Sequence, residues 1–193
     1  MKKYLFAKAF FCSLFIFILA SCSSKNSDSR QSSIQFEDNL PHDAHSSRLI
    51  AATNPAEAKD FTTKLLNGKE FKLSDYSGEI VILNIWATWC QPCVEEMPDL
   101  TEIYQAYKDQ GVMILGVSID EQGRSVVEPF VEKYNVTYPI TIDDGTIIEK
   151  YGPTMGIPTT YIIGPKGYLR YFVTGALTKR ELKPRLEKLL NES

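Results

Sequence analysis

The chain has 193 residues, of which 44% are hydrophobic and 23% are charged. This balance is typical of a globular protein and excludes collagen-like, wholly disordered and multi-span membrane chains. The formal net charge of -3 provides no basic field for a phosphate backbone, so nucleic acid is not an expected partner. The 4 cysteines are too few and too unevenly spaced for the disulfide framework of a small secreted domain.

The N-terminus has the pattern of a secretory signal. Lysines precede an apolar run over residues 10–20, which is shorter than the roughly 20 residues that a membrane-spanning helix needs. The run is followed by Cys22 in the context Leu-Ala-Ser-Cys, which resembles the bacterial lipobox, where the cysteine receives a diacylglycerol and becomes the new N-terminus. An ordinary signal with an incidental cysteine is the alternative. We expect residues 1–21 to be a lipoprotein signal peptide and lipid on Cys22 to anchor the protein to a membrane.

A polar, serine-rich segment follows. Residues 22–57 show no hydrophobic periodicity and are predicted to form a flexible tether. Both histidines, His42 and His45, lie in this segment, where no packed neighbours would orient them as metal ligands. The folded domain is predicted over residues 58–193.

The domain sequence alternates strand-like and helix-like segments, which predicts an α/β fold with a mixed sheet flanked by helices. A hairpin is indicated by the Asn-Gly pair in residues 61–73. Apolar strands flank a helix and form a βαβ unit. The expected order is hairpin 61–73, strand 81–87, helix 92–108, strand 112–119, helix 124–135, strand 137–142, helix 145–152, a hairpin over 159–175 and helix 177–190.

Cys90 and Cys93 stand where a buried strand is predicted to give way to a helix. The free N–H groups and partial positive charge of a helix N-terminus favour thiolate over thiol, so Cys90 is the expected nucleophile. The spacing of three places Cys93 close enough for a disulfide with Cys90. After Cys90 attacks a substrate disulfide, Cys93 would resolve the mixed disulfide.

A structural disulfide and half of a zinc site are the alternatives for this pair. Zinc needs two further ligands, and residues 58–193 contain no histidine and no third cysteine. A structural disulfide across so short a loop would restrict little of the unfolded chain. We therefore expect redox chemistry with no metal and no cofactor other than the Cys90–Cys93 disulfide itself.

Residues 58–190 resemble a thioredoxin-fold protein of the TlpA/ResA type, the envelope-anchored thiol-disulfide oxidoreductases. The segment ILNIWATWCQPCVEEMP at 82–98 resembles that family's active-site segment, and GIPTTYIIGPKG at 156–167 resembles the loop and hairpin that carry its cis-proline. Residues 121–141 fall where the family inserts a helix and a strand. The resemblance implies a thioredoxin-like fold with a mixed central sheet flanked by helices, an N-terminal hairpin and this central insertion.

The resemblance also implies a substrate-binding surface. In the family, the proline that matches Pro158 is cis and packs beside the dithiol, which leaves the backbone of Ile157 free to bond an extended substrate. Trp89, next to Cys90, is expected to cover the disulfide and to offer an apolar surface to partners, whereas Trp86 is expected in the core.

The same resemblance assigns an acid–base role to Glu96. The family carries a functional glutamate at this position, and Glu96 continues the spacing of three from Cys90 through Cys93. A solvated pair of Glu95 and Glu96 on the helix surface is the alternative. Thioredoxins carry a buried aspartate where this chain has Asn84, a neutral amide that cannot act as a base and is expected to be a satisfied amide in an apolar strand.

The resulting hypothesis is an extracytoplasmic thiol-disulfide oxidoreductase that is held on a bacterial membrane by lipid at Cys22 and reduces disulfides of envelope proteins. The resemblance implies apocytochrome c as a candidate substrate and a membrane protein of the CcdA/DsbD type as electron donor. A disulfide oxidase or isomerase is the alternative, because about 30 mV of potential corresponds to only 1.4 kcal/mol.

Two further classes of function are disfavoured by the sequence. A peroxiredoxin-like peroxidase requires threonine three residues before its reactive cysteine, where this chain has Ala87 before Cys90. A copper-delivery protein of the SCO type requires a wider cysteine pair and a downstream histidine, and the domain has neither.

Overall fold

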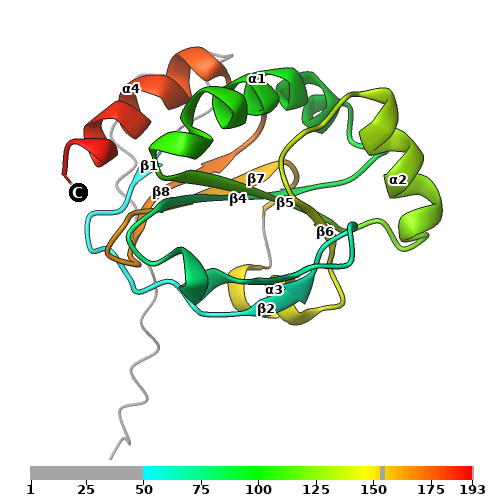
Figure 1. Cartoon of the computed structure of the whole chain (residues 1–193), viewed down its shortest axis with the longest axis horizontal. Helices are drawn as coiled ribbons and strands as arrows, with labels where there is room; N and C mark the ends of the chain where they lie inside the picture. The colour runs from blue at the N-terminus through cyan, green and yellow to red at the C-terminus, as the bar shows by residue number, and fades with distance from the viewer. Residues whose placement is uncertain (1–49, 153–154, 193) are drawn as a thin grey trace, which may run out of the picture. The chain divides into compact units, whose positions relative to one another are not determined.

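The computed structural model describes residues 50–152 and 155–192 and shows a mixed sheet between helical layers (Figure 1). The predicted signal peptide, Cys22 and the tether up to residue 49 lie outside the described residues. The six-stranded sheet has the order β1-β8-β7-β4-β5-β6, and β2 and β3 form a separate ladder. The strands are β1 Ile50–Ala51, β2 Thr62–Lys64, β3 Glu70–Lys72, β4 Ile80–Trp86, β5 Val112–Ser118, β6 Ile140–Ile142, β7 Thr159–Ile163 and β8 Leu169–Thr174.

Four α-helices surround the sheet in the described part of the chain. They are α1 Gln91–Tyr107, α2 Arg124–Lys133, α3 Thr146–Tyr151 and α4 Lys179–Leu190, with short 3-10 helices at Leu73–Tyr76 and Lys108–Gln110. None of the described helices is long and apolar enough to cross a bilayer. The α/β class and the mixed sheet flanked by helices that the sequence predicts are confirmed.

The central strand β4 is buried along its whole length. It pairs in parallel with β5 on one side and antiparallel with β7 on the other. Side chains such as Ile82 and Trp86 face a core that contains residues of α1, α2 and α4, whereas Leu83 and Ile85 face a second core with the β2–β3 ladder and α3. Because both faces are covered, the apolar run of this strand, which only Asn84 interrupts, has the physical cause that the sequence suggested.

The folded domain begins earlier than predicted. Ile50 and Ala51 pair antiparallel with Phe172 and Tyr171 of β8. The ladder-like contacts continue as the Leu169 N–H donates to the carbonyl of Ala56. Residues 50–57 therefore belong to the sheet edge and not to the tether. Sequence patterning missed them because they bind mainly through backbone groups and none of their side chains is fully buried.

Helix α1 begins directly after the turn that follows β4. Cys90 is its N-cap residue, with an extended backbone, and Pro92 lies in the first turn. Proline is well placed there because a first-turn N–H has no partner within the helix. The fold thus delivers Cys90 from the end of a buried strand to the start of a helix, as the sequence predicts.

Candidate active site

Cys90 and Cys93 form a disulfide, with their Cα atoms 5.2 Å apart. Cys90 is 5% exposed and Cys93 is fully buried. Both cysteines are thus buried, and of the two only Cys90 keeps a small exposed fraction. Within residues 50–152 and 155–192, His, Cys, Asp and Glu side chains do not gather in a group of three or more that could hold a metal ion.

The sulfur of Cys90 lies at the N-terminus of α1. The Cys93 N–H donates to Cys90 Sγ over 3.3 Å, and the Val94 N–H donates to the Cys90 carbonyl over 3.2 Å. A helix N-terminus presents unsatisfied N–H groups and a partial positive charge, and both favour a thiolate at the cap position. This environment suits Cys90 to be the attacking sulfur.

Glu96 is buried one helical turn beyond Cys93, with 3% of its surface exposed. Its Oε1 accepts from Asn84 Nδ2 at 2.7 Å, and its Oε2 accepts from the Leu177 N–H at 2.8 Å. Burial raises the pKa of this carboxyl to about 7, although the two donors favour the ionised form. Both protonation states are thus accessible near neutral pH.

Glu95 has the opposite environment. Its side chain is exposed and accepts a hydrogen bond from Gln91 Nε2 at 3.2 Å. The alternative of a solvated glutamate pair therefore describes Glu95 but is wrong for Glu96, which points into the protein.

Asn84 lies in the middle of β4 and connects Glu96 to the neighbouring strand. Its Nδ2 donates to Glu96 Oε1 and also to Thr160 Oγ1 at 3.0 Å, and Thr160 is its register partner in β7. Its Oδ1 has no hydrogen-bond partner among the described residues. The expectation of a satisfied amide is therefore wrong for the oxygen. The amide nitrogen instead holds Glu96, a contact between strand and helix that sequence spacing did not indicate.

The loop before β7 approaches the same end of the sheet. The Ile157–Pro158 peptide bond is cis, as the family resemblance implied. Because Thr159 pairs antiparallel with Ile85, Pro158 lies at the carboxyl end of β4, level with its last residue, Trp86.

Two large apolar side chains are exposed around this end of the sheet. Trp89 is 67% exposed, and Met155, three residues before Pro158, is 91% exposed. Ile157 is partly buried against both cores, and Trp86 is fully buried, as expected. Met155 was missed by sequence analysis, because a single methionine in a loop has no periodicity that reveals its exposure.

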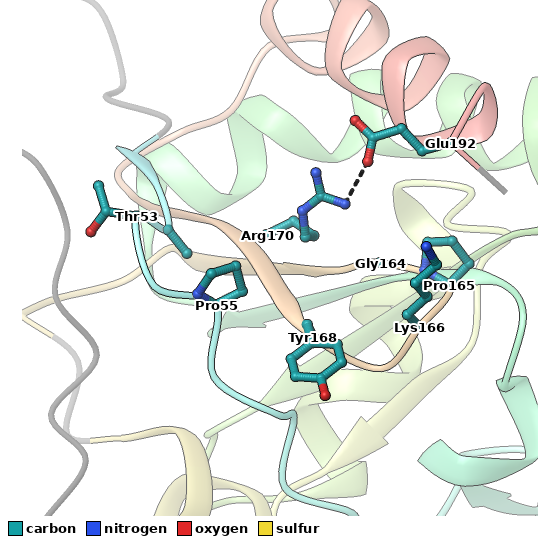
Figure 2. A pocket seen from close by; sticks show the side chains of 9 residues that line it. Thr53, Pro55, Gly164, Pro165, Lys166, Tyr168, Arg170 and Glu192 are labelled. Atoms are coloured by element: carbon teal, nitrogen blue, oxygen red, sulfur yellow. Dashed lines mark hydrogen bonds and ion pairs between the residues drawn. The ribbon is translucent and has the colours of Figure 1, made fainter.

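A separate open cavity of about 480 Å³ lies at the opposite end of β7 (Figure 2). Arg170 and Glu192, which both line it, form an ion pair with 2.7 Å between Nη1 and Oε2. The strand β7 runs from Thr159, next to Pro158, to Ile163, next to the cavity wall at Gly164. No cysteine lines this cavity, so it is distinct from the disulfide site. Other side chains in its wall are Thr53, Pro55, Pro165, Lys166 and Tyr168.

Comparisons with known proteins show which family the chain resembles. Residues 55–172 match the model of the AhpC/TSA family. The thiol-disulfide oxidoreductase ResA of Geobacillus kaustophilus (strain HTA426) is 43% identical over 135 residues, which cover 68% of this chain and 75% of that protein. The thioredoxin-like protein YneN of Bacillus subtilis (strain 168) is 34% identical over 147 residues, which cover 76% of this chain and 86% of that protein.

Solved structures confirm the thioredoxin-like fold that the resemblance implies. StoA from Bacillus subtilis superposes with a TM-score of 0.59 and 28% identity, covering 67% of this chain and 98% of that one. A thiol:disulfide interchange protein of the thioredoxin family from Chlorobium tepidum TLS superposes with a TM-score of 0.67 and 26% identity, covering 72% and 99% of the two chains.

Burial of Glu96 predicts a loss of stability as pH rises from 4.5 to 7. The carboxyl ionises near pH 4.5 in the unfolded chain but has a pKa of about 7 in the folded protein. Between these values the folded state holds the extra proton, so the free energy of unfolding falls with rising pH. The free energy of unfolding should fall by about 3 kcal/mol over this range. Glu96→Gln should remove this part of the pH dependence in urea unfolding of the oxidised protein.

Glu95→Gln is the matched control, because Glu95 is exposed. It should retain the pH profile of the unsubstituted protein. Profiles for Glu96→Gln and the unsubstituted protein that run parallel from pH 4.5 to 7 would contradict the assignment of the raised pKa to Glu96.

Proposed function

Because the chain belongs to the AhpC/TSA family and, within it, to the ResA-type thiol-disulfide oxidoreductases, we propose that it reduces disulfides of extracytoplasmic proteins, with Cys90 attacking and Cys93 resolving. The observation that carries the proposal is the difference between the two cysteines. Cys90, at the start of α1, keeps 5% of its surface exposed, whereas Cys93 is fully buried. A substrate disulfide can therefore contact Cys90 directly, whereas it becomes linked to Cys93 only by way of a bond to Cys90.

The reaction proceeds in two exchanges. In the reduced protein, the Cys90 thiolate attacks one sulfur of the substrate disulfide, a mixed disulfide forms, and the other substrate sulfur leaves as a thiolate. Cys93 then loses its proton and attacks Cys90 Sγ, which forms the Cys90–Cys93 disulfide and releases the second substrate thiolate. Two electrons pass from the protein to the substrate, so each cycle requires a donor that reduces the disulfide again.

Glu96 is the proposed acceptor for the Cys93 proton. A fully buried thiol ionises with difficulty, because burial disfavours the thiolate. Glu96 lies one turn along the same side of α1, is itself buried, and has a pKa of about 7. A general base is most effective when its pKa is near the working pH. The Asn84 amide and the Leu177 N–H position its two oxygens.

The substrate is proposed to bind as an extended segment beside Pro158. The exposed side chains of Trp89 and Met155 supply apolar contact area near the attacking sulfur, and the backbone of Ile157 supplies hydrogen-bonding groups. An extended peptide bound mainly through backbone groups is a recurrent recognition mode and tolerates varied side chains.

The cellular setting remains part of the proposal. The N-terminal pattern supports export and a lipid anchor at Cys22, on the extracytoplasmic face of a bacterial membrane. On that side a reductase lacks the thiol-reducing pool of the cytosol, which favours a membrane electron donor of the CcdA/DsbD type. Haem-attachment cysteines of apocytochrome c are the proposed substrate within this setting.

Substitution of the resolving cysteine should trap substrates. In Cys93→Ser, the Cys90 thiolate keeps its helix-terminal position but the mixed disulfide cannot be resolved. The variant should accumulate covalent complexes in the producing cell, which non-reducing gels and mass spectrometry would identify. The matched variant Cys90→Ser should accumulate far fewer.

The identity of the trapped proteins tests the finer proposals. Precursors of c-type cytochromes together with a membrane electron donor would support them, whereas many unrelated envelope proteins would indicate a general reductase or isomerase. Complexes with Cys90→Ser but not with Cys93→Ser would reverse the roles of the two cysteines.

Glu96→Gln should slow thiol-disulfide exchange by about 10²-fold at neutral pH, because a positioned acid or base contributes about 10²- to 10⁴-fold. The rate of reduction of a peptide disulfide by the unsubstituted protein should rise with pH through about 7, where Glu96 ionises, and this inflection should be absent from the variant. Glu95→Gln should retain both the rate and the profile. Equal, small effects of the two substitutions would exclude Glu96 from proton transfer.

Cys22→Ala should abolish lipidation of the full chain made in a bacterial host. Mass spectrometry of the mature N-terminus should find diacylglycerol on Cys22 of the unsubstituted protein and an unprocessed or released chain in the variant. Cys12→Ala is the control, because Cys12 lies within the predicted signal peptide. An unmodified N-terminus at another residue would refute the anchor.

A further inference from the structure

A buried aspartate lies beside the turn that delivers Cys90. Strands β4 and β5 are parallel, with Trp86 opposite Ser118 at their ends. Thr88 lies two residues beyond the end of β4, and Asp120 lies two residues beyond the end of β5. Asp120 is 3% exposed, although it has no part in the exchange reaction described above.

The carboxylate of Asp120 binds both strand ends. Its Oδ1 accepts from Thr88 Oγ1 at 2.6 Å. Its Oδ2 accepts from the Thr88 N–H at 3.0 Å and from Ser118 Oγ at 2.8 Å. The Asp120 N–H donates back to Ser118 Oγ at 3.1 Å. A buried polar network whose members are satisfied in this way is rigid, because breaking any bond leaves a polar group unpaired.

Thr88 is a central residue of the turn from Ala87 to Cys90. The Cys90 N–H donates to the Ala87 carbonyl over 3.2 Å and closes this turn. Asp120 holds Thr88 by its backbone and by its side chain at once, so the direction of the turn is fixed from outside it. Cys90 follows two residues after Thr88, at the end of the turn. The orientation of the turn therefore determines whether the Cys90 sulfur lies within reach of the Cys93 N–H.

We propose that Asp120 is a positioning residue for Cys90. Together with Thr88 and Ser118 it forms a clamp, the Asp120 clamp, that keeps the turn oriented so that the Cys90 sulfur stays at the N-terminus of α1. Asp120 acts through Thr88 and does not itself contact the reacting atoms. The inference rests on the proposed role of Cys90 as the attacking thiol.

Geometry and charge predict opposite effects of this carboxylate. As a nearby negative charge, Asp120 would disfavour the Cys90 thiolate. As part of the clamp, it favours the thiolate by keeping the sulfur at the helix N-terminus. Thr88→Val separates the two effects, because it removes the hydroxyl that binds Oδ1 and leaves the carboxylate in place.

The test measures iodoacetamide alkylation of Cys90 in the fully reduced protein as a function of pH, with peptide mass spectrometry to identify the modified cysteine. In Thr88→Val the alkylation rate at pH 7 should fall about three- to tenfold, with its pH midpoint raised, because less thiolate is present. Thr88→Ser retains the hydroxyl and should restore the rate. Ser118→Ala, which removes a donor further from the turn, should change the rate in the same direction by less.

Thr101→Val is the matched control for loss of a threonine hydroxyl, because Thr101 Oγ1 in α1 has no hydrogen-bond partner among the described residues. It should leave the alkylation profile unchanged. A lower melting temperature for Thr88→Val with an unchanged profile would overturn the proposal, and so would a lowered pH midpoint, which would show that charge prevails. Alkylation of Cys93 in the unsubstituted protein would instead contradict the proposed roles of the two cysteines.

Discussion

The placement of a helix N-terminus at the end of a buried strand is the constraint on which this site depends. Strand β4 is covered on both faces, so its end cannot move without disturbing two cores, and α1 begins after a turn of four residues that closes on Ala87 and Cys90. The partial positive charge of the helix is useful to a thiolate only within its first turn. Rigid support on either side of that turn is therefore a requirement for the chemistry as well as for the fold.

Two opposing effects determine the proton affinity of the Glu96 carboxyl. Desolvation of Glu96 favours its neutral form, whereas the donors Asn84 and Leu177 favour its charged form. Donors lower the pKa of a carboxyl and burial raises it, so the pKa of about 7 reflects both effects, with burial the larger. The asparagine in β4 thus lowers the pKa of Glu96 through a neutral amide, where an ionisable residue would have added a charge of its own.

Several elements of the fold could be predicted from the sequence, since each depends on local patterns. The apolar run of β4, the Asn67-Gly68 turn and the start of a helix at the cysteine pair follow from local sequence patterns, and all three occur in the structure. The pairing of residues 50–57 with β8 was missed because backbone contacts leave no side-chain pattern. The bonds of Asp120 to Thr88 and of Asn84 to Glu96 join residues that only the folded sheet brings together.

The contact between Glu96 and Leu177 has a consequence for the order of folding. The two cysteines are neighbours in sequence and can meet as soon as the first turn of α1 forms, whereas the Leu177 N–H is separated from Glu96 by 81 positions. Contacts at such long range form late, because a large loop must close first. During folding, the two thiols can therefore meet before Glu96 acquires its Leu177 donor, and we expect oxidation at that early stage to depend on local chain geometry alone.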